Sequence, residues 1–97
     1  MRAIMYAGQA VTSSDRVAIE LLAYAKSLAD RGAVDVVSIP IVGDGGADSF
    51  DLLVGAGIAI GVGPVADPLT EVVGADLAID DLRERQARLV GPRRDGS

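Results

Sequence analysis

Hydrophobic and polar positions in this chain follow two periods, and each predicts a different kind of element. Residues 34–42 (VDVVSIPIV), 49–54 (SFDLLV) and 58–63 (IAIGVG) are short β-branched or alternating apolar runs, separated by the glycine-rich joints GDGGAD and GAG. Such alternation between glycine-rich joints is typical of strands connected by tight turns. Residues 2–7 (RAIMYA) form a further short apolar run, which predicts a first strand.

Helical periodicity is clearest between residues 15 and 31. Apolar side chains fill one broad arc of a helical wheel there, and most charged residues fill the other. Gly32 is suited to end this helix. With Thr12 as the N-cap, Asp15 stands at the third helical position, where a carboxylate favours the positive end of the helix dipole.

Ile19 and Ala23 break the polar face of this helix. A single exposed apolar residue usually carries no meaning, although it can mark a contact with a partner. A second helix is predicted from about Asp76 or Asp80 to Val90, where the following Gly-Pro pair stops it.

The elements predict one α/β domain of the α+β type over residues 1–90, in the order β-α-β-β-β-α. We expect a small two-layer sandwich, with a mainly antiparallel sheet and helices on one face. Only the crossover from the first strand to the second favours parallel pairing. Pro40 lacks a backbone N–H for strand pairing, which indicates an edge strand. Gly61 and Gly63 are small residues on one face of a strand and suggest that another element, most simply the helix, packs closely there. Residues 91–97 (GPRRDGS) are expected to be disordered.

Composition removes several kinds of chemistry. Among 97 residues there is no Cys, His or Trp, so disulfides, thiolate chemistry, the usual zinc ligands and the usual neutral-pH base are missing. The net charge is −5, with nine acidic and no basic residues between positions 32 and 82. An acidic middle of this length repels phosphate backbones. We therefore expect no nucleic-acid partner for the body of the domain.

Neither a membrane span nor a secretory leader is predicted. The longest uncharged run, residues 52–66, is shorter than a membrane helix requires. The start, MRAIMYAGQAV, lacks an apolar segment of adequate length before a cleavage site. We expect a cytoplasmic protein without membrane contact.

Residues 42–48 (VGDGGAD), with GIAIGVG and a later AD, resemble the C-terminal motif of haloacid-dehalogenase-type phosphatases and P-type ATPases. The resemblance implies Mg²⁺ as cofactor, held by Asp44 and Asp48, and a helix after the motif. The chain departs from that family because no aspartate precedes Asp15 after the first strand, and Lys26 lies on the first helix. Phosphoryl transfer needs both groups, so a phosphatase-like protein or its degenerate relic is an alternative function.

A second alternative is a small anionic-ligand binder. Gly55-Ala56-Gly57 echoes a dinucleotide fingerprint, but that fingerprint requires a helix at the glycines and IAIGVGP favours a strand. The backbone N–H groups near Gly55 and Gly57 could instead form an anion nest. Asp51 could join Asp44 and Asp48 around Ca²⁺ or Mg²⁺, although solvated hairpin acids are the simpler interpretation since no EF-hand spacing is present.

The run VTSSDRVAIELLAYAKSLADRGAVDVVSIPI, followed by a polar turn, DLLVGAG and PV, resembles a group of short, uncharacterised actinobacterial α/β proteins. Members carry a VTSD…A..LL.YA..LA..G..D.V.IP stretch and then a strand that ends in an LLIGPGS-like turn. The match spans most of residues 11–65. It supports the order of elements, implies that GDGGAD is a variable hairpin loop, and implies no activity.

The missing catalytic residues and the exposed strand edges favour a non-enzymatic domain that acts through protein contacts. A homodimer or another protein partner fits this interpretation, which requires no cofactor and assigns no catalytic residue. The ligand, partner, pathway and oligomeric state stay open at this point.

Overall fold

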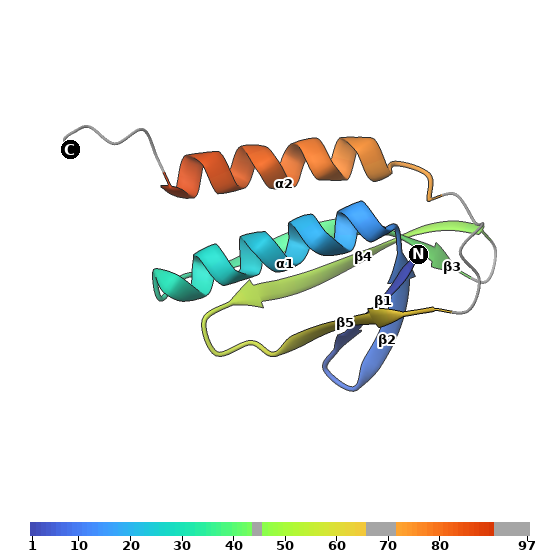
Figure 1. The fold of residues 1–97 in the computed structure, drawn as a ribbon, viewed down its shortest axis with the longest axis horizontal. Helices are drawn as coiled ribbons and strands as arrows, with labels where there is room; N and C mark the ends of the chain where they lie inside the picture. The colour runs from blue at the N-terminus through green and yellow to red at the C-terminus, as the bar shows by residue number, and fades with distance from the viewer. Residues whose placement is uncertain (44–45, 66–71, 91–97) are drawn as a thin grey trace.

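A computed structural model describes residues 1–43, 46–65 and 72–90, in which five strands and two helices follow the order β-β-α-β-β-β-α (Figure 1). The strands are β1 (Arg2–Tyr6), β2 (Gln9–Ser13), β3 (Val34–Gly43), β4 (Gly46–Gly55) and β5 (Ile60–Pro64), and the helices are α1 (Asp15–Asp30) and α2 (Ala75–Val90). All pairing is antiparallel, in one sheet of order β2-β1-β5 and a second of β3-β4. The predicted α+β two-layer fold is confirmed. Residues 91–97, predicted to be disordered, lie outside the described residues.

The first hairpin differs from the prediction, because residues 9–13 form a strand where only a helix entry was expected. β2 pairs with β1, and Tyr6 lies opposite Gln9 across a two-residue turn. Ala7 and Gly8 both have positive φ, 51° and 81°, as a type I′ hairpin turn requires. The expected parallel pairing of the first strand is wrong, since β1 lies between β2 and β5 and is antiparallel to both.

Helix α1 begins two residues later than its expected cap implied. The N-cap is Ser14, whose Oγ accepts a hydrogen bond from the Val17 N–H at 3.1 Å. Thr12, the expected cap, lies in β2. The end agrees with the prediction, since Gly32 follows the C-cap with a φ of 66°.

The β3–β4 hairpin confirms the reversal of chain direction predicted at GDGGAD. The two strands pair along their whole length, up to Gly43 opposite Gly46. Within the described residues β3 pairs only with β4, so Pro40 does lie in an edge strand. Its carbonyl accepts a 2.6 Å hydrogen bond from the buried Ser13 hydroxyl, which connects the end of β2 to the second sheet.

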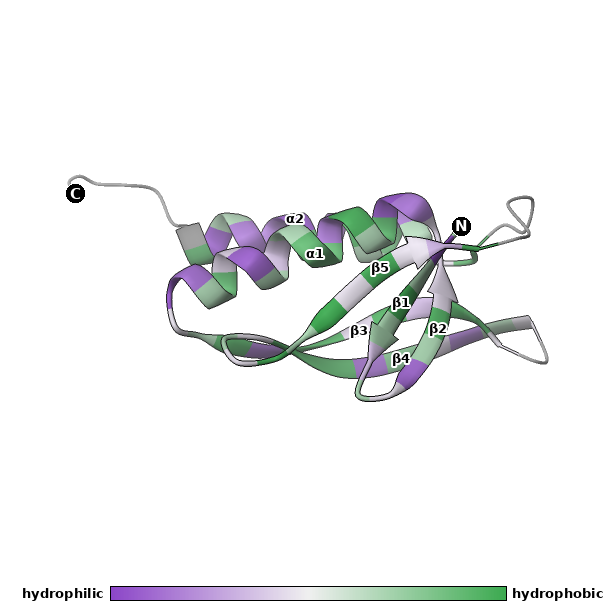
Figure 2. Ribbon diagram, turned by 60° about the horizontal axis from the view of Figure 1, so that its bottom comes forward, coloured by the Kyte–Doolittle hydropathy of each residue, from purple (hydrophilic) through white to green (hydrophobic). Residues whose placement is uncertain are grey.

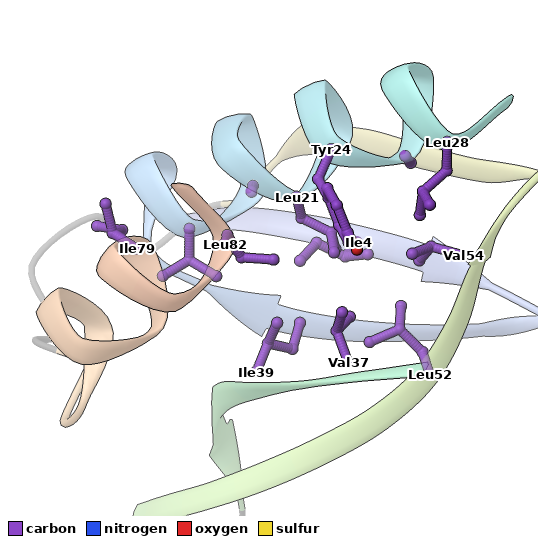
Figure 3. Packing of buried hydrophobic residues seen from close by; sticks show 13 residues of the cluster. Ile4, Leu21, Tyr24, Leu28, Val37, Ile39, Leu52, Val54, Ile79 and Leu82 are labelled. Carbon is purple, nitrogen blue, oxygen red and sulfur yellow. The ribbon is translucent and has the colours of Figure 1, made fainter. Parts of the chain in front are cut away.

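The core lies between α1, α2 and the inner faces of both sheets (Figure 3). It is almost wholly aliphatic, as the composition predicts, and its largest fully buried side chains are Ile4, Leu21, Ile39, Leu52 and Leu82. Two aromatic rings, Tyr6 and Phe50, meet edge-to-face at 6.0 Å beside it. The Tyr6 hydroxyl also accepts a hydrogen bond from the Leu53 N–H at 3.1 Å, which links β1 to β4.

The small residues of β5 do not face a helix, contrary to expectation. A Cβ built on Gly61 or Gly63 would lie 3.5 or 3.6 Å from the Cε of Met5, which lies directly opposite Gly61 on β1. Because successive strand residues point to opposite faces, Val62 packs against the core while the glycines lie on the other face. The close contact is therefore with a methionine on the outer side of the sheet.

Candidate functional site

Of the acidic residues of the predicted cation site, the structure describes Asp48 and Asp51. Asp44 lies outside the described residues. Asp48 is exposed on β4 and its Oδ1 accepts the Ser49 N–H at 2.8 Å. Asp51, three residues further along the strand, points to the opposite face. Within residues 1–43, 46–65 and 72–90, no group of three or more His, Cys, Asp and Glu side chains could hold a metal ion.

The phosphatase-like motif also lacks its expected surroundings. The segment after the motif is strand β4 rather than the helix that the resemblance implies. Lys26 lies on the exposed side of α1, where its Nζ donates to Asp30 at 2.8 Å. No cation is thus directed from this position toward the hairpin. Within the described residues, Lys26 is paired with Asp30 and no aspartate follows β1 at the position of the family's nucleophile, and phosphoryl transfer needs both groups.

The glycines of the predicted anion site belong to a turn in which the N–H groups of Ala56 and Ile58 are already bound. Ile58 N–H donates to the Gly55 carbonyl at 3.1 Å, and Gly57, with a φ of 77°, occupies the third position of this β-turn. Ala56 N–H donates to the Ala33 carbonyl at 2.9 Å. Two of the N–H groups that an anion would need are therefore bound within the chain, so the turn is better explained by chain reversal.

A polar cluster joins α1, β3 and α2. The Tyr24 hydroxyl donates to Asp35 Oδ2 at 2.5 Å, and Arg85 Nη1 donates to the same oxygen at 2.9 Å. Arg85 Nε also donates to Asp81 at 2.8 Å. Asp35 and Arg85 are each about 30% exposed, with side-chain values of 31% and 29%.

The protonation equilibria of this cluster favour a structural role. The Tyr24 hydrogen bond, helped by the Arg85 guanidinium, lowers the pKa of Asp35 despite its partial burial. Burial, followed by the hydrogen bond to Asp35, raises the pKa of Tyr24 to about 12. Asp35 is therefore ionised and Tyr24 neutral near pH 7. Their hydrogen bonds, together with those of Arg85, connect α2 to α1 and β3.

An open apolar groove lies on the other flank of α1, where the helix meets the start of β5. We call this surface the α1–β5 face; its main residues are Ile19, Leu22, Ala23, Lys26 and Ala29 of α1 together with Ile58, Ala59 and Ile60. Ile19 is 56% exposed and Leu22 is 44% exposed. Figure 2 shows α1 and β5 side by side, with hydrophobic positions on both.

Part of this face follows from the sequence. Ile19 and Ala23 are the two apolar breaks in the polar side of the helix, and both are exposed. The broad apolar arc expected for residues 15–31 also includes Leu22 and Ala29, which are exposed. The residues that α1 buries are a narrower set: Val17, Ala18, Leu21, Tyr24, Ala25 and Leu28. The apolar arc of this helix is thus wider than the face that it packs against the core. α2 covers one flank of α1, and the apolar residues on the other flank form the exposed face (Figure 1).

Comparisons with known proteins return no protein-family model, no curated protein and no solved structure that matches the chain. Neither helix that the structure describes has the length and apolar composition needed to cross a membrane.

Proposed function

We propose that this domain acts through protein contacts rather than catalysis, and that the α1–β5 face is its contact surface. The observation that carries the proposal is the pair of large apolar side chains, Ile19 and Leu22, exposed beside the Ile58–Ile60 segment. Apolar residues gathered beside a groove are the usual mark of a protein interface. The cytoplasmic location expected from the sequence belongs to this proposal.

The neighbouring strand gives the face a second means of contact. Among the described residues β5 pairs only with β1, so its other edge carries unpaired backbone groups. An unpaired edge readily accepts a strand from another chain. The edge-strand homodimer expected from the sequence is therefore compatible with the α1–β5 face, since both involve the start of β5.

Self-association gives the direct test of this surface. We expect wild-type protein in sedimentation equilibrium at micromolar concentrations to show a mass above that of the monomer. Leu22→Glu places a charge in the apolar groove and should shift the equilibrium toward monomer by about tenfold or more in the dissociation constant. Leu77→Glu is the matched control, because Leu77 is 77% exposed on α2, outside the face.

Two results would contradict the proposal. One is a wild type that remains monomeric at every concentration. The other is an equal effect of Leu22→Glu and Leu77→Glu, which would show that general hydrophobicity and not this surface causes association. Circular dichroism of both variants confirms that the fold persists, since neither leucine is buried.

A further inference from the structure

We infer that the partner of the α1–β5 face is a second copy of this chain, docked with its α1 antiparallel to the first and with the two-fold axis beside Ala23. This inference rests on the contact function proposed above and specifies who occupies the surface and in which register. It follows from the line of exposed residues along α1 and from the charges at the two ends of that line.

The exposed line consists of Arg16, Ile19, Ala23, Lys26 and Asp30, all of them solvent-exposed. Consecutive members are separated by three or four positions, so they lie along one side of the helix. The same spacing forms the contact line between two helices that pack side by side. Ala23, at the middle of the line, has the smallest side chain and permits the closest approach of two helix axes.

The charges on this line are complementary under a two-fold axis at Ala23. Arg16 lies seven positions before Ala23 and Asp30 lies seven positions after it. In an antiparallel pair of identical helices, each Arg16 therefore faces Asp30 of the second copy, and the contact occurs twice. Asp30 already accepts from Lys26 at 2.8 Å within its own copy, so the interface places this carboxylate between two cations.

The overall charge explains why a second copy would use this surface. A net charge of −5 makes two copies repel each other. The exposed line of α1 has two cations, Arg16 and Lys26, and one acid, Asp30. Two copies can therefore meet along it without uncompensated negative charge. Ile19 and Leu22 supply the apolar contact between these ends. The surface is self-complementary, which is what a two-fold interface requires.

Reversal of the end charges tests the register. In Arg16→Glu the two acids at the ends of the interface repel, and in Asp30→Arg the two cations do. We expect each single variant to weaken dimerisation about tenfold or more, and the double variant Arg16→Glu/Asp30→Arg to recover the wild-type dissociation constant within a factor of about three. Sedimentation equilibrium at low salt gives all four constants, and the differences should shrink as salt is added.

The single variants are expected to leave the monomer folded. An acid in the first turn and a base in the last turn of α1 both favour the helix dipole, so a loss of association does not reflect unfolding. Single variants that dimerise like the wild type, or a double variant that is not rescued, overturn the inference. If Leu22→Glu still disrupts the dimer in that case, the contact function stands with another register, such as pairing of β5 edges. A wild type that is monomeric throughout overturns both.

Discussion

Gly55, at the end of β4, and Gly57, in the turn that follows, both have a positive φ but differ in their surroundings. Gly55 has a φ of 128° and Gly57 a φ of 77°, values that residues with a Cβ rarely adopt. A Cβ at Gly55 would lie 2.2 Å from the Ala33 carbonyl oxygen, and none of the surrounding atoms comes within 4 Å of a Cβ at Gly57. Glycine at position 55 is therefore required for two reasons: its dihedral angle, and the close approach of the Ala33–Val34 backbone.

This difference predicts unequal costs for the same substitution. Gly57→Ala should lower the free energy of unfolding by about 1 kcal/mol, the cost of a left-handed conformation for an L-residue. Gly55→Ala should cost about 3 kcal/mol or more, because the Ala33–Val34 backbone must also move. Urea denaturation of the two variants measures the difference. Equal losses would show that the approach of Ala33 does not constrain the turn.

The sequence marks both positions as turn residues, but it cannot distinguish them. The composition GAG and the alternation on either side are local signals. Ala33 directly precedes β3, and its carbonyl contacts Gly55 because β3 and β4 pair with Val34 opposite Gly55. A residue-scale requirement of this kind depends on strand register, which is a non-local property.

At the scale of elements, strand pairing also decides where α1 begins. Thr12, Ser13 and Ser14 are three consecutive hydroxyl residues, and any of them is a suitable N-cap by type. Pairing of β2 with β1 places Thr12 opposite Ala3 and Ser13 opposite Arg2. Only Ser14 is then left at the helix start, where its hydroxyl accepts the Val17 N–H. The choice of cap follows from a strand pairing that the local pattern does not reveal.

Removing the cap hydroxyl tests this assignment. Ser14→Ala should lower the free energy of unfolding by about 1 kcal/mol, because the Val17 N–H loses its partner. Thr12→Ala is the matched control: it removes a hydroxyl from β2 and should cost less. Thermal unfolding followed by circular dichroism compares the two. A larger loss for Thr12→Ala would instead support the cap expected from the sequence.

The two hairpins show which elements could be predicted. The β3–β4 hairpin has long β-branched runs and a glycine-rich joint, and the prediction of a reversal there was right. The β1–β2 hairpin turns at Ala7-Gly8 and continues as QAVTS. Ala at the first turn position gives none of the Asn-Gly or Asp-Gly signal of type I′ turns, and QAVTS has little periodicity. The groove could be predicted only in part, on the α1 side, since the segment at Ile58–Ile60 meets α1 only in the folded chain.

At the scale of the whole molecule, α2 is held by a few polar contacts in addition to buried Ile79 and Leu82. The cluster of Tyr24, Asp35 and Arg85 connects three elements that are distant in sequence. Tyr24 and Arg85 both donate to Oδ2 of Asp35. Protonation of Asp35 therefore weakens both hydrogen bonds at once. Attachment of α2, and with it the stability of the domain, should therefore depend on pH.

The direction of that dependence follows from the two pKa shifts. The pKa of Asp35 is lowered from its usual 3.8, so its contribution is present above pH 3.8 and is lost as pH falls through the lower pKa of the folded state. The pKa of Tyr24 is raised from 10.0 to about 12. Its contribution is complete below pH 10 and is lost as pH rises toward 12. Between these limits the cluster should stabilise the fold fully.

Asp35→Asn should remove the acidic part of this profile. At pH 7 the variant should be less stable by about 2 kcal/mol, since two charge-assisted hydrogen bonds are weakened. The gap between wild type and variant should narrow below pH 3.8, where protonation of Asp35 in unfolded and then folded chains makes the two proteins alike. Asp51→Asn serves as the control, because Asp51 is exposed on the outer side of β4 and its replacement should change stability by less than about 0.5 kcal/mol. A constant gap between wild type and Asp35→Asn from pH 7 to pH 2, measured by urea unfolding, would show that the side chain acts through packing and not through its charge.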